Sequence, residues 1–354
     1  MRPDGVGQSP NAKTEGLPPG DYELREQTIP CKLGPLTAFK PKFRLHVWNV
    51  GLLTGMAFGG DFSDTVLTDC DSDGFLLRSL PVLHDLPRVT ERGDLLQYAP
   101  FQYPRYYVDL TRGIEGYLAK FSPKSLSTLR RKVRHFAEEC GGKLDIREYQ
   151  LPGELESYYP IARSLSAKTY QEQQFDWGLP DTPEFHSEMS GAAGRGDVRA
   201  YLLFHGDRAV AYLYCPVRDG VVSYQYVGYD PEFGDRSPGT ILLWSALERL
   251  IAEGNHRLFD FTQGAGEHKR FFATGQQLCA DVYLLRRTPR NRLVVWSHMT
   301  CSSLFEKGMG LLERSGAKAT VKRLVYKQAP RKPREATPAS KRRAAPSRSG
   351  VSIP

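Results

Sequence analysis

The chain contains 354 residues, of which 40% are hydrophobic and 25% charged, and this composition excludes a collagenous or wholly disordered protein. No window approaches the roughly 20 uncharged apolar residues of a membrane-spanning helix, and the N-terminus lacks the apolar core of a secretory signal, so we expect a cytoplasmic protein. The net charge is +8, but Lys327–Pro354 alone carries eight basic residues and one acid. The basic excess therefore belongs to this tail and says little about what the folded part binds.

Two terminal segments and a three-part centre are predicted from composition. Residues 1–20 are rich in Gly, Pro, Asn and Ser, and residues 329–354 mix Pro, Ala, Ser and basic residues, so we expect both to be disordered. Between them we predict an N-terminal β-rich half-domain at 35–121, a main domain at 122–290 and a helical or strand extension at 291–328. The six cysteines are widely spaced and form no Cys/His cluster, so we expect free thiols and no metal site.

Short strands are predicted first along the chain, at 43–48, 64–69 and 75–83. Asp71-Ser72-Asp73-Gly74 lies between the last two and is typical of a hairpin turn. The longer stretch Asp69-Cys70-Asp71-Ser72-Asp73-Gly74 resembles the start of a calcium-binding EF-hand loop, but Leu80 stands where that loop needs a bidentate acid. We therefore expect a hairpin here.

Helices are predicted next. Ser122 can cap a helix that begins at Pro123, apolar residues recur every three or four positions as far as Phe136, and Gly141-Gly142 ends the pattern. Two further helices are expected at about 153–170 and 183–192. The first helix carries a basic face that includes Arg130 and Arg131, which could meet phosphates, anionic sugars or nucleic acid or could simply be solvated.

The second half of the chain reads as strands around one strong helix. Tight turns at Gly206-Asp207 and Asp219-Gly220 predict an antiparallel meander of three strands. An amphipathic helix opens near Thr240 and stops at Gly254. The predicted strands are 199–205, 208–217, 221–230, 257–261 and 279–287, and the region 292–315 is expected to be helical.

The junction before this helix is a candidate anion site. A helix N-terminus presents unpaired N–H groups and a partial positive charge. Glycines allow close approach to the backbone, while an arginine and hydroxyls add charge and donors, although an ordinary strand-to-helix loop would use similar residues. The residues of this candidate site are Gly234, Arg236, Ser237, Gly239 and Thr240.

A second candidate site follows the strand at 257–261. Asp260 stands at the strand end, and a glycine-rich loop leads to Glu267, His268 and Lys269. This set suits acid–base chemistry or the anchoring of an anionic substrate, and a solvated charged loop is the alternative.

Together these segments resemble the CelD-type, FemAB-like branch of the GNAT acyltransferases. Four pieces occur in the family's order: YYVDLTRGIEGYLAKFSPKSLSTLRRKVRHF (106–136), the meander at 209–233, the helix at 237–254, and LFDFTQGAGEHKRFFATG (258–275). The resemblance implies an α/β (α+β) GNAT fold, a mixed, mostly antiparallel twisted sheet flanked by helices, with 35–121 as a shortened GNAT-like half-domain.

The resemblance also implies an acyl-CoA donor, acetyl-CoA in the first instance, whose pyrophosphate rests on residues 234–240. It implies an amine acceptor, often an amino sugar or amino acid of envelope or polysaccharide pathways. The candidates for base and acid are Glu267, His268 and Asp260, with Tyr226 and Tyr229 behind them. Lys269, with Arg130 and Arg131 on the basic helix, is expected to bind an anionic group of donor or acceptor.

Two positions depart from the family's pattern. Ile241 stands where the pyrophosphate loop usually has a small residue, and His268 replaces the signature tyrosine before Lys269. An aminoacyl-tRNA-dependent FemAB-like transferase and a non-catalytic GNAT-like binding module therefore stay open as alternatives, and only the first would involve nucleic acid.

Overall fold

The computed structural model describes residues 17, 22–33, 36–58, 72–169, 172, 178–264 and 266–314. Three predicted segments lie outside these residues: the tail, the strand at 64–69, and the leader except for Leu17. The chain divides into two units, Met1–Thr28 with Pro41–Trp296 and Ile29–Lys40 with Ser297–Pro354. Among the described residues, no helix combines the length and apolar character needed to cross a membrane.

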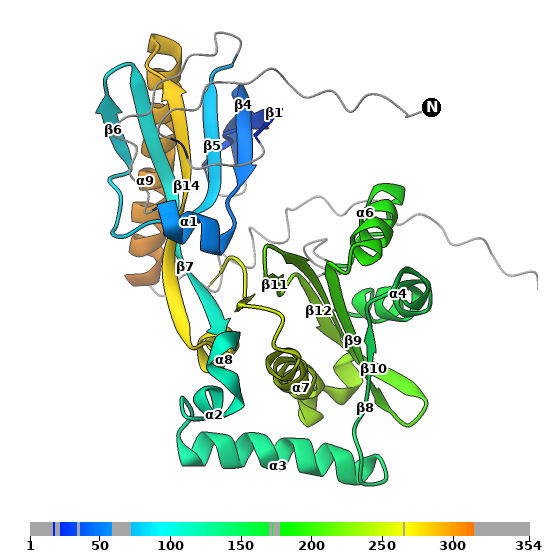
Figure 1. Cartoon of the computed structure of the whole chain (residues 1–354). Helices are drawn as coiled ribbons and strands as arrows, with labels where there is room; N and C mark the ends of the chain where they lie inside the picture. The colour runs from blue at the N-terminus through cyan, green and yellow to red at the C-terminus, as the bar shows by residue number, and fades with distance from the viewer. Residues whose placement is uncertain are drawn as a thin grey trace, which may run out of the picture. The chain divides into compact units, whose positions relative to one another are not determined.

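One twisted sheet of twelve strands organises the first unit (Figure 1). Its order is β1-β4-β5-β14-β7-β13-β11-β10-β9-β8, with β12 paired to β10 and β6 paired to β7. The pairs β4–β5 and β11–β13 are parallel and the others are antiparallel. The predicted mixed, mostly antiparallel sheet is thus confirmed. The strands are β1 Glu23–Thr28, β4 Lys42–Asn49, β5 Gly74–Pro81, β6 Val89–Arg92, β7 Leu95–Asp109, β8 Asp145–Tyr149, β9 Val198–His205, β10 Arg208–Arg218, β11 Val221–Ser223, β12 Tyr226–Tyr229, β13 Leu258–Asp260 and β14 Gly275–Arg286.

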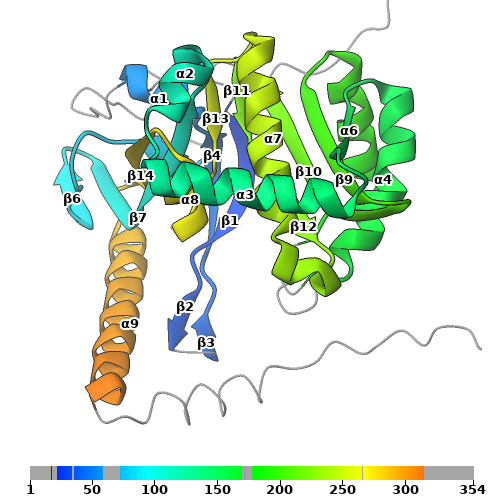
Figure 2. The same ribbon diagram turned by 90° about the horizontal axis from the view of Figure 1, so that it is seen from below.

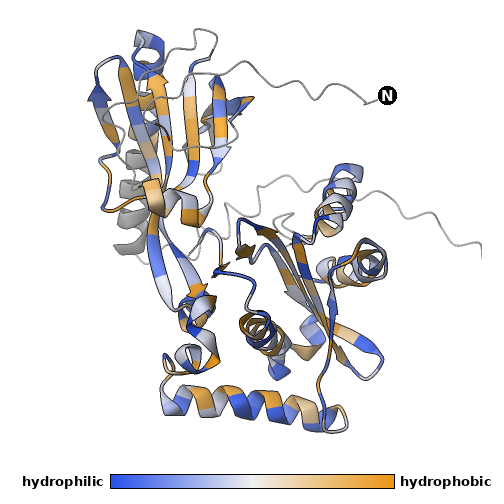
Figure 3. Ribbon diagram, in the orientation of Figure 1, coloured by the Kyte–Doolittle hydropathy of each residue, from blue (hydrophilic) through white to orange (hydrophobic). Residues whose placement is uncertain are grey.

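Helices cover both faces of the β8–β13 part of the sheet. On one face, α3 and α7 pack with the buried side chains of β9, β10 and β13 in one apolar cluster. On the other face, α4 and α6 pack against β9 and β10 in a second cluster. In Figure 3 the strands and α7 accordingly show many positions in orange, the colour of hydrophobic residues. The helices are α1 Leu52–Phe58, α2 Gly113–Leu118, α3 Pro123–Glu139, α4 Pro152–Ser166, α6 Pro183–Gly194, α7 Pro238–Glu253, α8 Glu267–Phe272 and α9 Pro289–Arg314, with 3-10 turns η1 Leu110–Arg112 and η2 Pro231–Arg236.

The second unit contains a separate two-stranded sheet and most of α9. Strands β2 (Cys31–Leu33) and β3 (Leu36–Phe39) pair with each other. Helix α9 confirms the helical prediction for 292–315.

The N-terminus of α3 forms as its sequence predicts. The Ser122 hydroxyl accepts a hydrogen bond from the Ser125 N–H at 3.2 Å, and Pro123 takes the first helical position. Leu129 and Phe136 are the buried residues of the apolar stripe. The basic residues of this helix therefore lie outside the apolar stripe.

One strand prediction needs correction. The strand expected at 221–230 is two strands, because the chain leaves the ladder at Tyr224 and Gln225. Strand β5 begins at Gly74 and pairs with β4 on one edge and with β14 on the other, and the hairpin partner expected at 64–69 lies outside the described residues. Strand β7 was not predicted; its 15 residues join the predicted half-domain to the main domain in one sheet.

Candidate functional site

The candidate site begins where two parallel strands separate. Strands β11 and β13 pair at three positions, ending with Ser223 and Asp260. The last link is the Tyr224 N–H, which donates to the Asp260 carbonyl at 2.8 Å. Beyond it, β12 continues beside β10, and within the described chain it pairs with β10 alone. One edge of β12 is thereby left without a neighbouring strand.

The amides on that edge can be identified from the register. The Asp230 N–H donates to the Val210 carbonyl at 2.8 Å, so the backbone amide of Asp230 points toward β10. Successive amides in a strand point to opposite edges. The N–H groups of Val227 and Tyr229 therefore point away from β10, toward the separation of the strands.

A cavity of about 500 Å³ lies beside this edge. Strand β12, the η2–α7 junction and α8 all contribute to its wall. Four of the five predicted cofactor residues line it, which leaves out Arg236. The lining residues are Thr169, Tyr224, Val227, Gly228, Tyr229, Pro231, Gly234, Ser237, Pro238, Gly239, Thr240, Leu243, His268 and Phe272.

The η2–α7 junction has an unusual backbone. Ser237 adopts the left-handed conformation (φ 55°, ψ 44°), which costs free energy for a residue with a side chain. Its carbonyl accepts hydrogen bonds from Thr240 and Ile241, and Pro238 begins α7 without an N–H. The positive end of α7 and the Gly239 amide are therefore placed at the cavity wall.

Arg236 lies outside the lining because a carboxylate holds it. Its Nε donates to Glu139 of α3 at 2.5 Å. The hydrogen bond and charge of Arg236 lower the pKa of Glu139, with help from His205 and His135. The positive charge of Arg236, which was expected to meet a phosphate, is thus already offset by the Glu139 carboxylate.

Lys132 is a residue that the sequence analysis missed. It lies on α3, and its Nζ donates to the Ser237 hydroxyl at 3.1 Å. Helix α3 packs against α7 (Figure 2), which brings this lysine to the cavity wall. Lys132, His135 and Glu139 recur at helical spacing, and this signal could have distinguished their face from that of Arg130, which lies on the opposite side of the helix.

Two members of the predicted catalytic set line the cavity, Tyr229 of β12 and His268 of α8. The His268 ring centroid lies 6.2 Å from that of Tyr224. The His268 side chain remains exposed on one side, but partial desolvation lowers its pKa below the usual value, and Lys269 lowers the pKa further. Neutral imidazole is therefore favoured at pH 7, the form that can accept a proton. Glu267 is the exposed first residue of α8.

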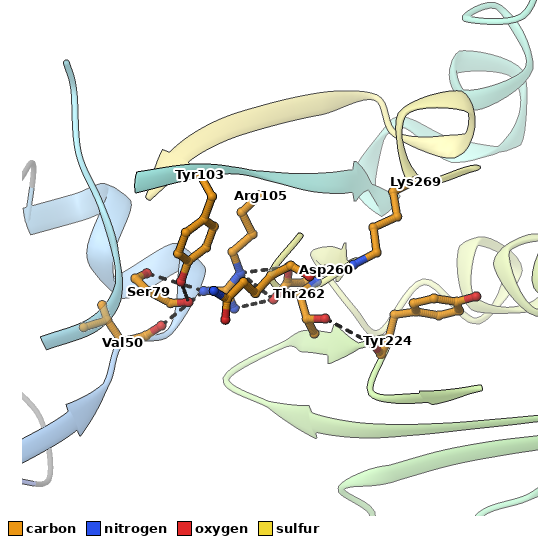
Figure 4. Close-up of polar contacts among 9 residues, drawn as sticks. Val50, Ser79, Tyr103, Arg105, Tyr224, Asp260, Thr262 and Lys269 are labelled. Carbon is orange, nitrogen blue, oxygen red and sulfur yellow. Dashed lines mark hydrogen bonds and ion pairs between the residues drawn. The ribbon is translucent and has the colours of Figure 1, made fainter. Parts of the chain in front are cut away.

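Asp260 and Lys269 are placed in structural contacts near the strand separation (Figure 4). The Asp260 carboxylate is fully buried and is bound by the Arg105 guanidinium, whose Nε lies 2.9 and 3.0 Å from its two oxygens. The Lys269 Nζ donates to the Gln263 carbonyl at 2.8 Å. Burial lowers the pKa of Lys269, against the opposing charge of Asp260. Neither residue belongs to the cavity lining.

The remaining predicted residues lie elsewhere. Tyr226 packs against Phe185 and Tyr214 in the cluster on the α4–α6 face, away from the cavity. Arg130 and Arg131 line a second hollow on α3, together with Arg134. Tyr226, Arg130 and Arg131 are therefore predicted site residues that do not line the cavity, unlike His268 and the loop residues before α7. Among the described residues, no group of His, Cys, Asp or Glu side chains could hold a metal ion.

Residues 123–270 match the family described as an acetyltransferase (GNAT) domain. No curated protein sequence matches the chain.

Solved structures resemble the chain at low sequence identity. One is the C-terminal domain of a putative lysylphosphatidylglycerol synthetase from Agrobacterium fabrum, at 14% identity and TM-score 0.41, covering 58% of this chain and 66% of that one. L-PGS from Bacillus licheniformis is 15% identical, with TM-score 0.39 and coverage of 63% and 71%. FemX is 9% identical, with TM-score 0.39 and coverage of 54% and 64%.

Proposed function

We propose that the chain, in which residues 123–270 match an acetyltransferase (GNAT) domain, transfers an acyl group from acyl-CoA to an amine. One observation supports this most strongly. The cavity joins the free edge of β12 to the N-terminus of α7, so a thioester and a pyrophosphate on one extended molecule can each find a suitable partner.

The donor fits the residues present at both ends of the cavity. The Gly239 amide, with the Ser237 and Thr240 hydroxyls, would hold the pyrophosphate, because the Thr240 amide already donates to the Ser237 carbonyl. Arg236 lies next to this loop, paired with Glu139. The Val227 and Tyr229 amides would bind the pantetheine arm and the thioester carbonyl. When bound, the donor supplies an activated acyl group.

His268 is proposed as the base. A neutral amine attacks the thioester carbonyl, a C–N bond forms, and His268 takes the proton that the nitrogen loses. A β12 amide stabilises the negative charge on the carbonyl oxygen. The C–S bond then breaks, and the imidazolium can return its proton to the leaving thiolate. Glu267 is the proposed second acid, while Asp260 and Tyr226 take no part in this scheme.

The acceptor is proposed from the family resemblance. An amino sugar or amino acid of an envelope or polysaccharide pathway would supply the nucleophilic amine. The basic hollow lined by Arg130, Arg131 and Arg134 favours one alternative, an aminoacyl-tRNA donor, because these arginines suit a phosphate backbone.

Calorimetric titration of the full chain with acetyl-CoA and longer acyl-CoAs tests the proposal. We expect micromolar binding. A Gly239→Asp variant should weaken it at least tenfold, because a carboxylate would repel the pyrophosphate. Gly239→Ala is the matched control, since its Cβ would lie 3.4 Å from the Tyr229 ring without adding charge. Binding of a charged tRNA but of no acyl-CoA would instead support the aminoacyl-tRNA alternative, and binding of neither would support a non-catalytic module.

A further inference from the structure

Two side chains of α3 hold adjacent residues of the η2–α7 junction. Lys132 Nζ donates to Ser237 Oγ at 3.1 Å, and Glu139 accepts from Arg236 Nε at 2.5 Å. Seven residues separate Lys132 from Glu139, which is two helical turns or about 10.5 Å along the same face. The two contacts therefore fix the junction at two separate points of α3.

The two contacts leave very different charges at the cavity. Glu139 offsets the charge of Arg236 and also lies 3.3 Å from His205 Nε2 and 3.1 Å from His135 Nδ1. Lys132, in contrast, donates to a neutral hydroxyl, and in the described part of the chain it forms no ion pair. Lys132 therefore brings an uncompensated positive charge to Ser237 at the wall of the cavity.

We propose that Lys132 is the phosphate-binding cation of this site and that Arg236 instead positions the loop. This inference rests on the proposed acyl-CoA donor. An ammonium group has three N–H donors, so the bond to Ser237 leaves two for phosphate oxygens. Ser237 lines the cavity and holds the lysine beside the α7 N-terminus, where the backbone already favours an anion.

The location of Lys132 explains how a departure from the family's loop pattern can be tolerated. Ile241 stands where the pattern has a small residue. A small residue would let the phosphate approach the backbone closely. The Lys132 ammonium, from a different helix, attracts the phosphate without requiring that close approach.

Calorimetry of the full-length protein with coenzyme A and with pantetheine, which lacks phosphates, tests the inference. Lys132→Ala should weaken coenzyme A binding about tenfold, as expected for loss of one charge-assisted hydrogen bond, and Lys132→Arg should restore most of it. Pantetheine affinity should be the same in wild type and Lys132→Ala. Lys124→Ala is the matched control, because Lys124 is an exposed lysine of the same helix.

The outcomes separate this inference from the proposed function. Tight coenzyme A binding that is equal in wild type and Lys132→Ala would overturn the role of Lys132 and leave the donor proposal intact. Equal losses for coenzyme A and pantetheine would also overturn it, since they would indicate a distorted cavity. Failure of the wild type to bind coenzyme A would overturn both.

Discussion

Asp260, at the end of β13, is bound across the sheet by Arg105 of β7, 155 residues earlier in the chain. The Asp260 side chain is fully buried and that of Arg105 is 11% exposed. Arg105 also donates to the Val50 and Ser79 carbonyls at 3.5 Å (Figure 4), and the Thr262 N–H donates to Asp260. The pair thus ties the segments around the strand separation to one another.

Breaking this pair should destabilise the protein strongly. Asp260→Asn leaves the buried Arg105 charge without a counter-ion, a change that typically costs about 3–5 kcal/mol. Urea denaturation should show this loss. Glu138→Gln, which breaks an exposed 3.7 Å pair with Arg134, should change the free energy of unfolding by less than about 1 kcal/mol. Equal, small effects of the two substitutions would contradict a structural role for Asp260.

Asp230 predicts how stability depends on pH. Burial alone would raise its pKa, but hydrogen bonds from Lys168, Arg208 and the Glu232 N–H outweigh burial and hold the pKa at about 2. In the unfolded chain the pKa of an aspartate is near 4, so the lower pKa in the folded protein stabilises the fold at every pH above about 4. This stabilisation is lost as the pH falls from 4 toward 2 and Asp230 takes up a proton. Asp230→Asn should lower the free energy of unfolding by about 2 kcal/mol at pH 7 and flatten its decline between pH 4 and 2. An unchanged acid slope in urea melts at several pH values would count against this.

Gly228 is predicted to be essential for packing behind the cavity. A Cβ there would lie 2.6 Å from both Thr169 Cγ2 and Tyr212 Cε1. Gly228→Ala should therefore cost about 1–3 kcal/mol and also weaken acyl-CoA binding, because Thr169 and Gly228 line the cavity. In Gly194→Ala an added Cβ would meet no atom within 4 Å, so its melting temperature should stay within about 2 °C of wild type.

Much of the fold could be predicted from local patterns, whereas the pairings between distant segments could not. Ser122 and Gly254 delimit helices by capping chemistry that is visible in a few residues. The break after Ser223 depends on where β13 departs from β11, so the sequence near Tyr224 reads as one continuous strand. Long strand β7 carries mixed apolar and polar residues on its exposed parts, and its periodicity is correspondingly weak.

The candidate site divides in the same way. That the loop from Gly234 to Thr240 leads into a helix was predictable, because its proline and glycines are local signals of a helix start. The roles of Asp260 and Lys132 depend on partners 155 and 105 residues away, and no single sequence reports such contacts. Tyr226 was misplaced for a simpler reason: alternate residues of a strand face opposite sides, and without a known register the tyrosines of this segment look alike.

His268 gives the sharpest test of the proposed chemistry. Partial desolvation and Lys269 lower its pKa, so an NMR titration of the imidazole should have a midpoint below about 6.5. Because the base must be neutral, the rate of acyl transfer should rise with pH through that midpoint and level off near pH 7. His268→Gln should lower kcat by about 10²-fold and remove this acid limb, while His84→Gln, an exposed histidine remote in sequence, should change neither. An acid limb that persists unchanged in His268→Gln would assign the proton transfer to another group, and Glu267→Gln would then be the next variant to measure.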